Sequence, residues 1–150
     1  MKIDYFTIPE IMVTYKDKVK PSERFRVEKS ADIAKILEVA FKDCMQHHEE
    51  VYVLYMNKGH RVLGISNVAK GGIDGTFVDI RVILQTALKV SASCLILSHN
   101  HPSGSSTPSN YDKDLTKKIK IGCQAVGLTL LDHVIISEET YSSFADEGLL

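Results

Sequence analysis

The sequence feature that most constrains the fold is a short unbroken run of apolar residues in the second half of the chain. A strand with one solvent-exposed face alternates apolar and polar residues, whereas a continuous apolar run is typical of a strand that is covered on both faces. Helices packed on both sides of a sheet provide that cover. The run, Cys94-Leu95-Ile96-Leu97, therefore predicts an α/β fold with a mixed β-sheet flanked by helices.

Helical and strand patterns alternate around this run. Apolar residues recur at helical spacing in three segments, the first of which begins at a possible N-cap, Ser30, and extends toward His47. Strand patterns are separated by turn residues, and a short helix or turn is expected at the C-terminal end. The helical patterns cover 30–47, 78–90 and 109–125, and the strand patterns cover 51–57, 61–68, 94–97 and 128–136.

The N-terminal part of the chain differs from the rest. Residues 6–15 have the composition of a strand, and Pro9 favours an edge position because proline cannot donate to a ladder. Residues 17–26 are charged and contain a proline, which indicates a loop or linker. We therefore expect an N-terminal strand and linker at 1–28 and one domain at 29–150. Because an edge strand pairs equally well with its own sheet or a partner's, the oligomeric state stays open.

Composition excludes several classes of protein. There are 18 Lys and Arg residues and 19 Asp and Glu residues, giving a net charge of −1, whereas proteins that mainly bind nucleic-acid phosphates are usually basic. No apolar run reaches the ~18 residues that a membrane span needs, and residues 1–10 lack the pattern of a secretory signal. An odd number of widely spaced cysteines predicts reduced core thiols and a cytoplasmic location. They are Cys44, Cys94 and Cys123.

A polar turn with two histidines follows the apolar run directly. His99 and His101 are two residues apart, and side chains at that spacing in extended backbone lie on the same face. Pro102 restricts His101 to extended conformations, which keeps both imidazoles on that face. The carboxyl end of a strand is also a common place for a ligand site. The two rings are therefore predicted to converge at the end of a rigid, buried strand.

A carboxylate completes a possible metal site. Asp112 lies eleven residues beyond His101, in the first turn of the expected third helix. Two neutral imidazoles and one carboxylate are a recurring zinc-binding set that leaves a fourth position for water. Ser109 and Asp112 also have the spacing of a helix capping box, and a His-x-His pair is often only a polar turn. The residues alone leave both interpretations open, and their occurrence together within fourteen residues favours the metal site.

These residues resemble a known family. The order His99-x-His101, seven residues, Ser109-x-x-Asp112 matches the zinc motif of the JAB/MPN (JAMM) metalloproteases. The amino-acid sequence at 99–104, His-Asn-His-Pro-Ser-Gly, resembles the bacterial RadC-like branch in particular. The resemblance covers about residues 30–150 and extends to the segments at 75–76, 132–136 and 141–144. It implies a JAB/MPN fold with a cytidine-deaminase-like architecture.

The resemblance also implies a catalytic glutamate before an earlier strand. In the family this residue precedes an apolar strand that ends in a Leu-Asn type corner, and residues 49–57 match that region. The match puts Glu49 at the catalytic position. Glu50, one residue away and on the opposite face, stays the alternative. Many relatives carry an aromatic residue where Val51 stands, so the chain departs from the family pattern there.

The reaction that the resemblance implies is hydrolysis of a peptide or isopeptide bond in a protein or peptide substrate. Zn²⁺ held by His99, His101 and Asp112 would lower the pKa of its bound water from 15.7 to about 7. Glu49 would accept the proton of that water and deliver it to the leaving amine. Ser109 would donate a hydrogen bond to the oxyanion of the attacked carbonyl.

Other motifs and histidines are assigned ordinary roles. The chain has no His-Glu-x-x-His, no Pro-Cys-x-x-Cys and no Gly-x-x-x-x-Gly-Lys, so other zinc-protease, deaminase and ATP-binding classes are not indicated. His47 and His48 are expected at a solvated helix end, His60 in a hairpin turn, and His133 as a structural residue on a strand. The substrate groove is expected between the 71–76 loop and the segment after Gly104.

Two other functions compete with the hydrolase. RadC-like proteins carry a DNA-repair label, but residues 1–28 show no helix-hairpin-helix pattern and the net charge is −1, so direct nucleic-acid binding is not expected. Some members of the wider superfamily lose their metal ligands and serve as binding modules. Every motif position is present here, which favours the enzyme.

Overall fold

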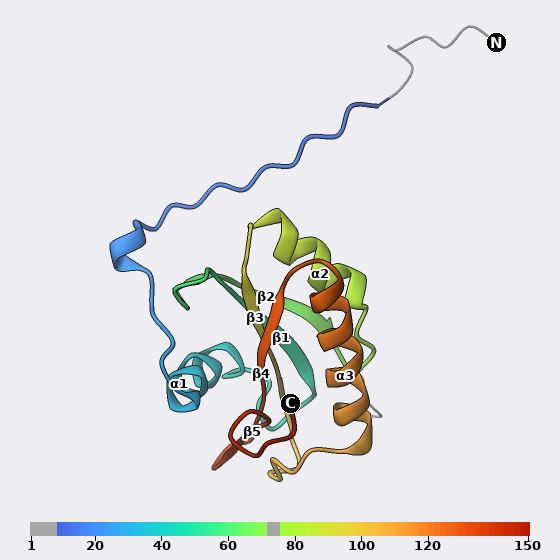
Figure 1. Cartoon of the computed structure of the whole chain (residues 1–150). Coiled ribbons are helices and arrows are strands. Elements are labelled where there is room, and N and C mark those ends of the chain that lie inside the picture. The colour runs from blue at the N-terminus through green and yellow to red at the C-terminus, as the bar shows by residue number, and fades with distance from the viewer. Residues whose placement is uncertain (1–8, 72–75) are drawn as a thin grey trace, which may run out of the picture.

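The computed structural model describes residues 9–71 and 76–150, which form a five-stranded mixed sheet with three α-helices and one 3₁₀ turn, Pro21–Glu23 (Figure 1). The strand order is β2-β1-β3-β4-β5. β3 and β4 are parallel, and the other neighbouring pairs are antiparallel. The helices are α1 (Ser30–Ala40), α2 (Ile80–Lys89) and α3 (Asn110–Ala125), and the strands are β1 (Glu50–Met56), β2 (Val62–Lys70), β3 (Cys94–Asn100), β4 (Thr129–Ile136) and β5 (Tyr141–Ser143). The predicted fold class is confirmed.

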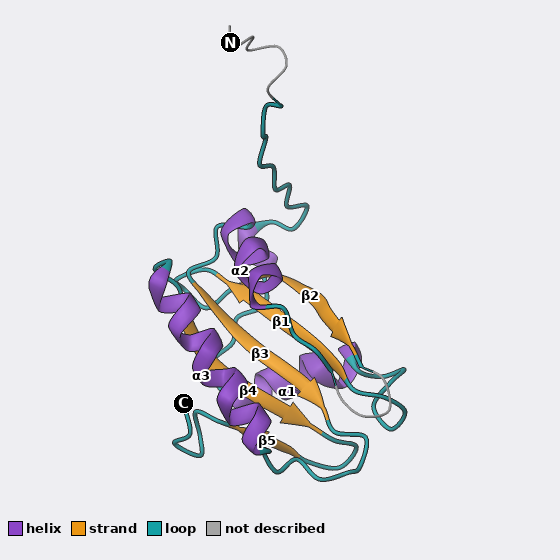
Figure 2. Ribbon diagram, turned by 90° about the vertical axis from the view of Figure 1, so that its right-hand side faces the viewer, coloured by secondary structure: helices purple, strands orange, loops and turns teal. Residues whose placement is uncertain are grey.

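Each face of the sheet has its own hydrophobic core, because side chains alternate between the faces along every strand. One core lies between the sheet and helices α2 and α3, and it contains Val53, Leu97 and Ile119. The other lies between the sheet and α1, and it contains Leu37 and Ile96. Figure 2 shows α1 on one side of the sheet and α2 and α3 on the other. The central strand β3 is buried along all seven residues, as the apolar run predicted.

The helix predicted from Ser30 toward His47 is shorter in the structure. α1 ends at Ala40, and residues 41–47 form turns. The NH₂ group of the buried Asn100 side chain lies within hydrogen-bond distance of three backbone carbonyl oxygens in and just after this segment, those of Cys44, Met45 and His48, at 3.2, 3.2 and 2.9 Å. A residue from β3 therefore satisfies carbonyl groups that a longer helix would have paired internally.

Two other element ends differ from the predictions. Ser30 is the first residue of α1 instead of its N-cap. The Asp32 carboxylate accepts the backbone N–H groups of Glu28 and Lys29, at 3.0 and 3.1 Å, and so satisfies donors at the start of the helix. At the C-terminal end, a strand, β5, precedes the expected turn and pairs with β4. Three residues are too few to show a strand pattern in the sequence, and this segment is a strand because it pairs with β4.

The predicted N-terminal strand is wrong in the part that can be judged. Residues 9–15 belong to no ladder, and residues 6–8 lie outside the described residues. Ile11, Met12 and Val13 are exposed by 87, 77 and 71%, so the apolar character of the segment is not used in a core. Packing begins near Val27, which is buried against α1, next to an isolated bridge between Arg26 and Arg61. None of the described helices has both the length and the apolar character to span a membrane.

Candidate metal centre

The candidate site forms where β3 ends and α3 begins. Residues 95, 97 and 99 point to the α3 side of the sheet, because Leu95 and Leu97 belong to the core beneath that helix. His99 therefore faces α3 directly, and His101 follows just after the last residue of the strand. Asp112 lies in the first turn of α3 and is 4% exposed. The structure thus brings together three residues that the sequence predicted as metal ligands.

The three side chains converge on one small volume. Nε2 of His99 lies 2.9 Å from Nε2 of His101 and 3.2 Å from Oδ1 of Asp112. Nε2 of His101 lies 3.6 Å from Oδ2 of Asp112. All three ligand atoms lie within 4.8 Å of one another. This separation suits ligands that surround a common ion, since zinc binds nitrogen and oxygen at about 2.0–2.2 Å from the metal.

Hydrogen-bond direction supports a cation at this point. Nδ1 of His101 is 2.8 Å from the carbonyl oxygen of Ser105, which can only accept, so Nδ1 carries the proton. In the neutral ring this leaves a lone pair on Nε2, directed at the cluster. The ionised carboxylate of Asp112 is also an acceptor only. Acceptor atoms that converge in a largely buried place favour a positive charge between them, and a divalent metal ion fits the set.

The electrostatics of the cluster follow from these contacts. Burial alone would raise the pKa of the Asp112 carboxyl, but the imidazoles of His101 and His99, which donate to this carboxylate whenever they carry a proton on Nε2, outweigh burial and hold that pKa well below its usual range. The hydrogen bond that a protonated His101 ring donates to Asp112 likewise raises the pKa of His101, against the lowering effect of burial. Asp112 is therefore a carboxylate at neutral pH, as a metal ligand must be.

Asp112 is a helix cap as well as part of this cluster. Its Oδ2 accepts the backbone N–H of Ser109 at 2.7 Å, while Oγ of Ser109 accepts the backbone N–H of Asp112 at 3.1 Å. This is a complete capping box around the start of α3. The two interpretations that the sequence left open are thus compatible, because one carboxylate oxygen caps the helix and the other faces His99.

A second group of possible ligands, Cys44, His48 and Glu50, has a different character. The Glu50 carboxylate faces Nε2 of His48 at 2.7 Å, accepts a hydrogen bond from the side-chain amide of Asn67, and lies 3.8 Å from Nζ of Lys70. Its charge is therefore compensated by protein donors. Nε2 of His48 must carry a proton to pair with the carboxylate, which removes the lone pair a metal would need. This group is a hydrogen-bonded network with no need for an ion.

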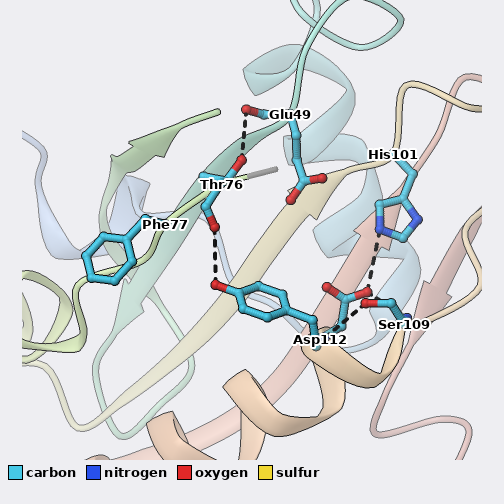
Figure 3. Close-up of a pocket in the computed structure, with 7 residues that line it drawn as sticks. Glu49, Thr76, Phe77, His101, Ser109 and Asp112 are labelled. Carbon is cyan, nitrogen blue, oxygen red and sulfur yellow. Dashed lines mark hydrogen bonds and ion pairs between the residues drawn. The ribbon is translucent and has the colours of Figure 1, made fainter. Parts of the chain in front are cut away.

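Glu49 and Ser109 lie on the same cavity as two of the ligands. The cavity has a volume of about 510 Å³, and Figure 3 shows the carboxyl group of Glu49 pointing into it. Its lining residues are Glu49, Thr76, Phe77, His101, Ser109, Tyr111 and Asp112. Glu50, one position along, is engaged in the network on the other side. Of the expected substrate loop at 71–76, Thr76 lines the cavity, while residues 72–75 lie outside the described residues.

Backbone contacts hold Glu49 in this position. Its carbonyl oxygen accepts hydrogen bonds from the backbone N–H of Gly71 at 2.7 Å and from the Thr76 hydroxyl at 3.4 Å. The next residue is anchored by Asn100, whose Oδ1 accepts the backbone N–H of Glu50 at 2.8 Å. Asn100 is not among the site residues predicted from the sequence. Its position in the pattern 94, 96, 98, 100, on the α1 side of β3, was the signal for a buried amide beneath the 44–50 segment.

The remaining histidines divide into two kinds. His60 lies exposed in the β1–β2 turn, as expected, whereas His47 and His48 lie at the end of the turns after α1 and not at a helix end. His133 is fully buried on β4, with Nε2 2.8 Å from Nδ1 of His99. The prediction of a structural histidine on a strand did not anticipate this contact. The parallel pairing of β3 with β4, which sets Leu97 opposite His133, creates it.

Comparison with known proteins agrees with this geometry. The family model of the RadC-like JAB domain matches residues 27–149. The chain belongs to the RadC-like JAB domain family. The family boundary agrees with the start of packing at Val27, and the resemblance read from the His99 to Asp112 motif is confirmed.

Three curated relatives that match the chain are named UPF0758 proteins. One from Flavobacterium johnsoniae is 47% identical over 102 residues, covering 68% of this chain and 44% of the relative. One from Porphyromonas gingivalis is 42% identical over 103 residues, covering 68% and 45%. One from Aquifex aeolicus is 38% identical over 136 residues, covering 88% and 59%. The chain therefore spans about half the length of the curated relatives it matches.

Proposed function

We propose that this chain is a zinc-dependent hydrolase that cleaves a peptide or isopeptide bond in a protein or peptide substrate. The observation that carries the proposal is one cavity lined by Glu49, Ser109, His101 and Asp112, with His99 in contact with the last two. JAB domains typically bind a metal, and two imidazoles with one carboxylate are a common zinc set in hydrolases. The three buried free cysteines agree with a reducing compartment such as the cytoplasm.

His99, His101 and Asp112 would hold the ion. Bound there, zinc would make a water molecule acidic enough to act as a nucleophile near neutral pH. The Glu49 carboxylate is the base within the cavity, and it would take the proton from the attacking water and deliver it to the nitrogen of the leaving amine. This assignment needs Glu49 to lie across the cavity from the ligands without joining them, which is its arrangement in Figure 3.

Ser109 would stabilise the charge that develops on the substrate. Its Oγ already accepts the N–H of Asp112, so its own hydrogen is free to be donated elsewhere. The residue is exposed and lines the cavity, and the helix cap fixes its backbone. A donor held in advance at the position of an oxyanion costs no reorganisation during the reaction.

The first experiment measures metal content. We expect one zinc per chain in the purified protein by mass spectrometry, and loss of zinc in His101→Ala. His60→Ala, which removes an exposed histidine outside the cluster, is the matched control and should retain zinc. Asp112→Asn preserves an oxygen for the helix cap while removing the charge, so it should fold and bind zinc weakly. A wild-type protein that binds no metal under these conditions overturns the proposal.

The second experiment separates the two neighbouring glutamates. Glu49→Gln and Glu50→Gln are compared with the wild type on a library of internally quenched peptides and ε-linked lysine isopeptides. We expect Glu49→Gln to keep zinc and lose about 10²–10⁴-fold in activity, as for removal of a general base. Glu50→Gln should retain activity, because that carboxylate belongs to the network with His48 and Asn67. A zinc-loaded wild type that cleaves no member of the library would indicate a binding module instead.

A further inference from the structure

A buried hydrogen-bonded chain lies behind His99, on the side away from the cavity. The ring of His133 is stacked on Phe144, with centroids 4.5 Å apart and an interplanar angle of 27°. Its Nδ1 is 2.6 Å from the hydroxyl of Thr116, and its Nε2 is 2.8 Å from Nδ1 of His99. Thr116 lies one turn after Asp112 on α3, and its hydroxyl is 2.6 Å from the Asp112 carbonyl oxygen. Thr116, His133 and Phe144 are not among the residues that line the cavity.

The carbonyl oxygen of Asp112 fixes the donor and the acceptor of every hydrogen bond in this series. The carbonyl oxygen of Asp112 can only accept, so the single hydroxyl hydrogen of Thr116 points to it. Oγ1 of Thr116 must then accept from His133, and Nδ1 of His133 carries a proton. The His133 ring is fully buried, and its nitrogens meet only Thr116 and His99 among the described residues, so it is neutral.

The proton position on His133 in turn determines the proton position on His99, which belongs to the candidate metal cluster. A neutral His133 with its proton on Nδ1 has a lone pair on Nε2, which accepts the Nδ1–H of His99. A neutral His99 with its proton on Nδ1 then has a lone pair on Nε2. That is the nitrogen that faces His101 and Asp112. With the opposite direction, an N–H of His99 would occupy the centre of the cluster, and a metal could bind only after that proton was lost.

We propose that Thr116 and His133 form a positioning pair that holds His99 in the one neutral tautomer able to bind a metal ion. The proposal rests on the proposed metal centre and adds the residues that prepare it. Partners of this kind behind a metal-bound histidine commonly change metal affinity by about 10–100-fold when they are removed. Neither residue touches the ion or the substrate, so their effect is on affinity and tautomer.

The test compares two substitutions at one position. Thr116→Val preserves the shape of the side chain and removes the hydroxyl, whereas Thr116→Ser retains the hydroxyl. Without an acceptor at Nδ1, the His133 proton moves to Nε2, and His99 must then accept at Nδ1 and protonate at Nε2. We expect ¹H–¹⁵N imidazole spectra of the metal-free protein to show His99 protonated at Nδ1 in wild type and Thr116→Ser, and at Nε2 in Thr116→Val.

Zinc affinity provides the second measurement. Competition with a chromophoric chelator should give Thr116→Val an affinity about 10–100-fold below wild type, with Thr116→Ser equal to wild type. A purely structural role would change the melting temperature and leave the tautomer of His99 as it was. The inference is overturned if Thr116→Val keeps both the wild-type tautomer and the wild-type affinity.

The wild type alone also tests the inference, so it does not depend on a variant that folds. Metal-free wild type with His99 protonated at Nε2 would refute the proposed direction of the chain. Failure of the metal centre is a separate result. A wild type with the expected tautomer that takes up no zinc would contradict the proposed function and leave the hydrogen-bond direction established.

Discussion

Asn100→Ala is expected to destabilise the fold strongly, although the side chain is neutral and small. The amide of Asn100 is 0% exposed and links β3 to the segment before β1. Its oxygen accepts the N–H of Glu50, and its NH₂ group faces the carbonyl oxygens of Cys44, Met45 and His48. Two amide hydrogens can serve only two of these carbonyls fully. The substitution therefore removes about three effective hydrogen bonds from a buried place.

The magnitude follows from this count. A net loss of about 1 kcal/mol for each hydrogen bond gives about 3 kcal/mol, and buried groups left without partners cost up to about 3 kcal/mol each. For a domain of this size, 3 kcal/mol corresponds to a fall of roughly 6–12 °C in the melting temperature. Glu49 lies next to the anchored N–H of Glu50, so any hydrolytic activity should fall even in the fraction that remains folded.

The assay is urea unfolding followed by circular dichroism, with the melting temperature as a second measure. Asn57→Ala is the matched control, because Oδ1 of Asn57 accepts two N–H groups in the β1–β2 turn, where water can replace it. We expect the control to lose about 1 kcal/mol or less. If Asn100→Ala lost no more than the control, the argument that this amide organises the segment carrying Glu49 would be refuted.

Three further predictions concern the metal, a buried carboxyl and the thiols. Zinc at 100 times its dissociation constant should stabilise the protein by about 2.7 kcal/mol, which calorimetry would register as a rise of roughly 5–11 °C in the melting temperature, reversed by a chelator. Burial raises the pKa of Asp132, although a hydrogen bond from Ser143 opposes it, so this carboxyl stabilises the fold most below about pH 4 and less as the pH rises through the folded pKa. The free energy of unfolding of the wild type, measured relative to Asp132→Asn, should therefore decrease between pH 4 and pH 8, and a flat difference would contradict this. Burial raises the pKa of Cys94 and Cys123 to about 11, so a thiol reagent at pH 8 should modify them only after denaturant is added.

Local patterns predicted the fold class and brought the main site residues to attention. The apolar run at 94–97 required cover on both faces, and the two-residue spacing of His99 and His101 predicted that their rings converge at the end of that strand. The spacing of Ser109 and Asp112 predicted a cap, which the structure contains. Each of these inferences depends on residues within a few positions of one another, where backbone geometry dictates which side chains share a face.

Features that depend on distant contacts were not accessible in this way. Beyond the end of α1 at Ala40, the carbonyl oxygens of Cys44 and Met45 are bound by Asn100, which lies on another element. The contact of His133 with His99 spans 34 residues and follows from the parallel register of β3 and β4. Strand composition at 9–15 predicted a ladder, but no neighbouring strand accepts it in the described structure. Composition indicates that a segment can form a strand, but a strand forms only where a neighbouring strand is available to pair with it.

The one parallel strand pair also has a consequence for the order of folding. β1 and β2 are neighbours in sequence and can close as a hairpin, whereas β3 and β4 pair only after the chain between them, including α3, has folded back across the sheet. Contacts between residues far apart in the sequence form slowly, because the chain loses the entropy of closing a long loop before the contact contributes any stabilising energy. Asp112 and His133 reach His99 in that late step, so we expect the proposed metal centre to be absent from the folding transition state. In a chevron plot, bound zinc should therefore lower the unfolding arm and leave the refolding arm almost unchanged.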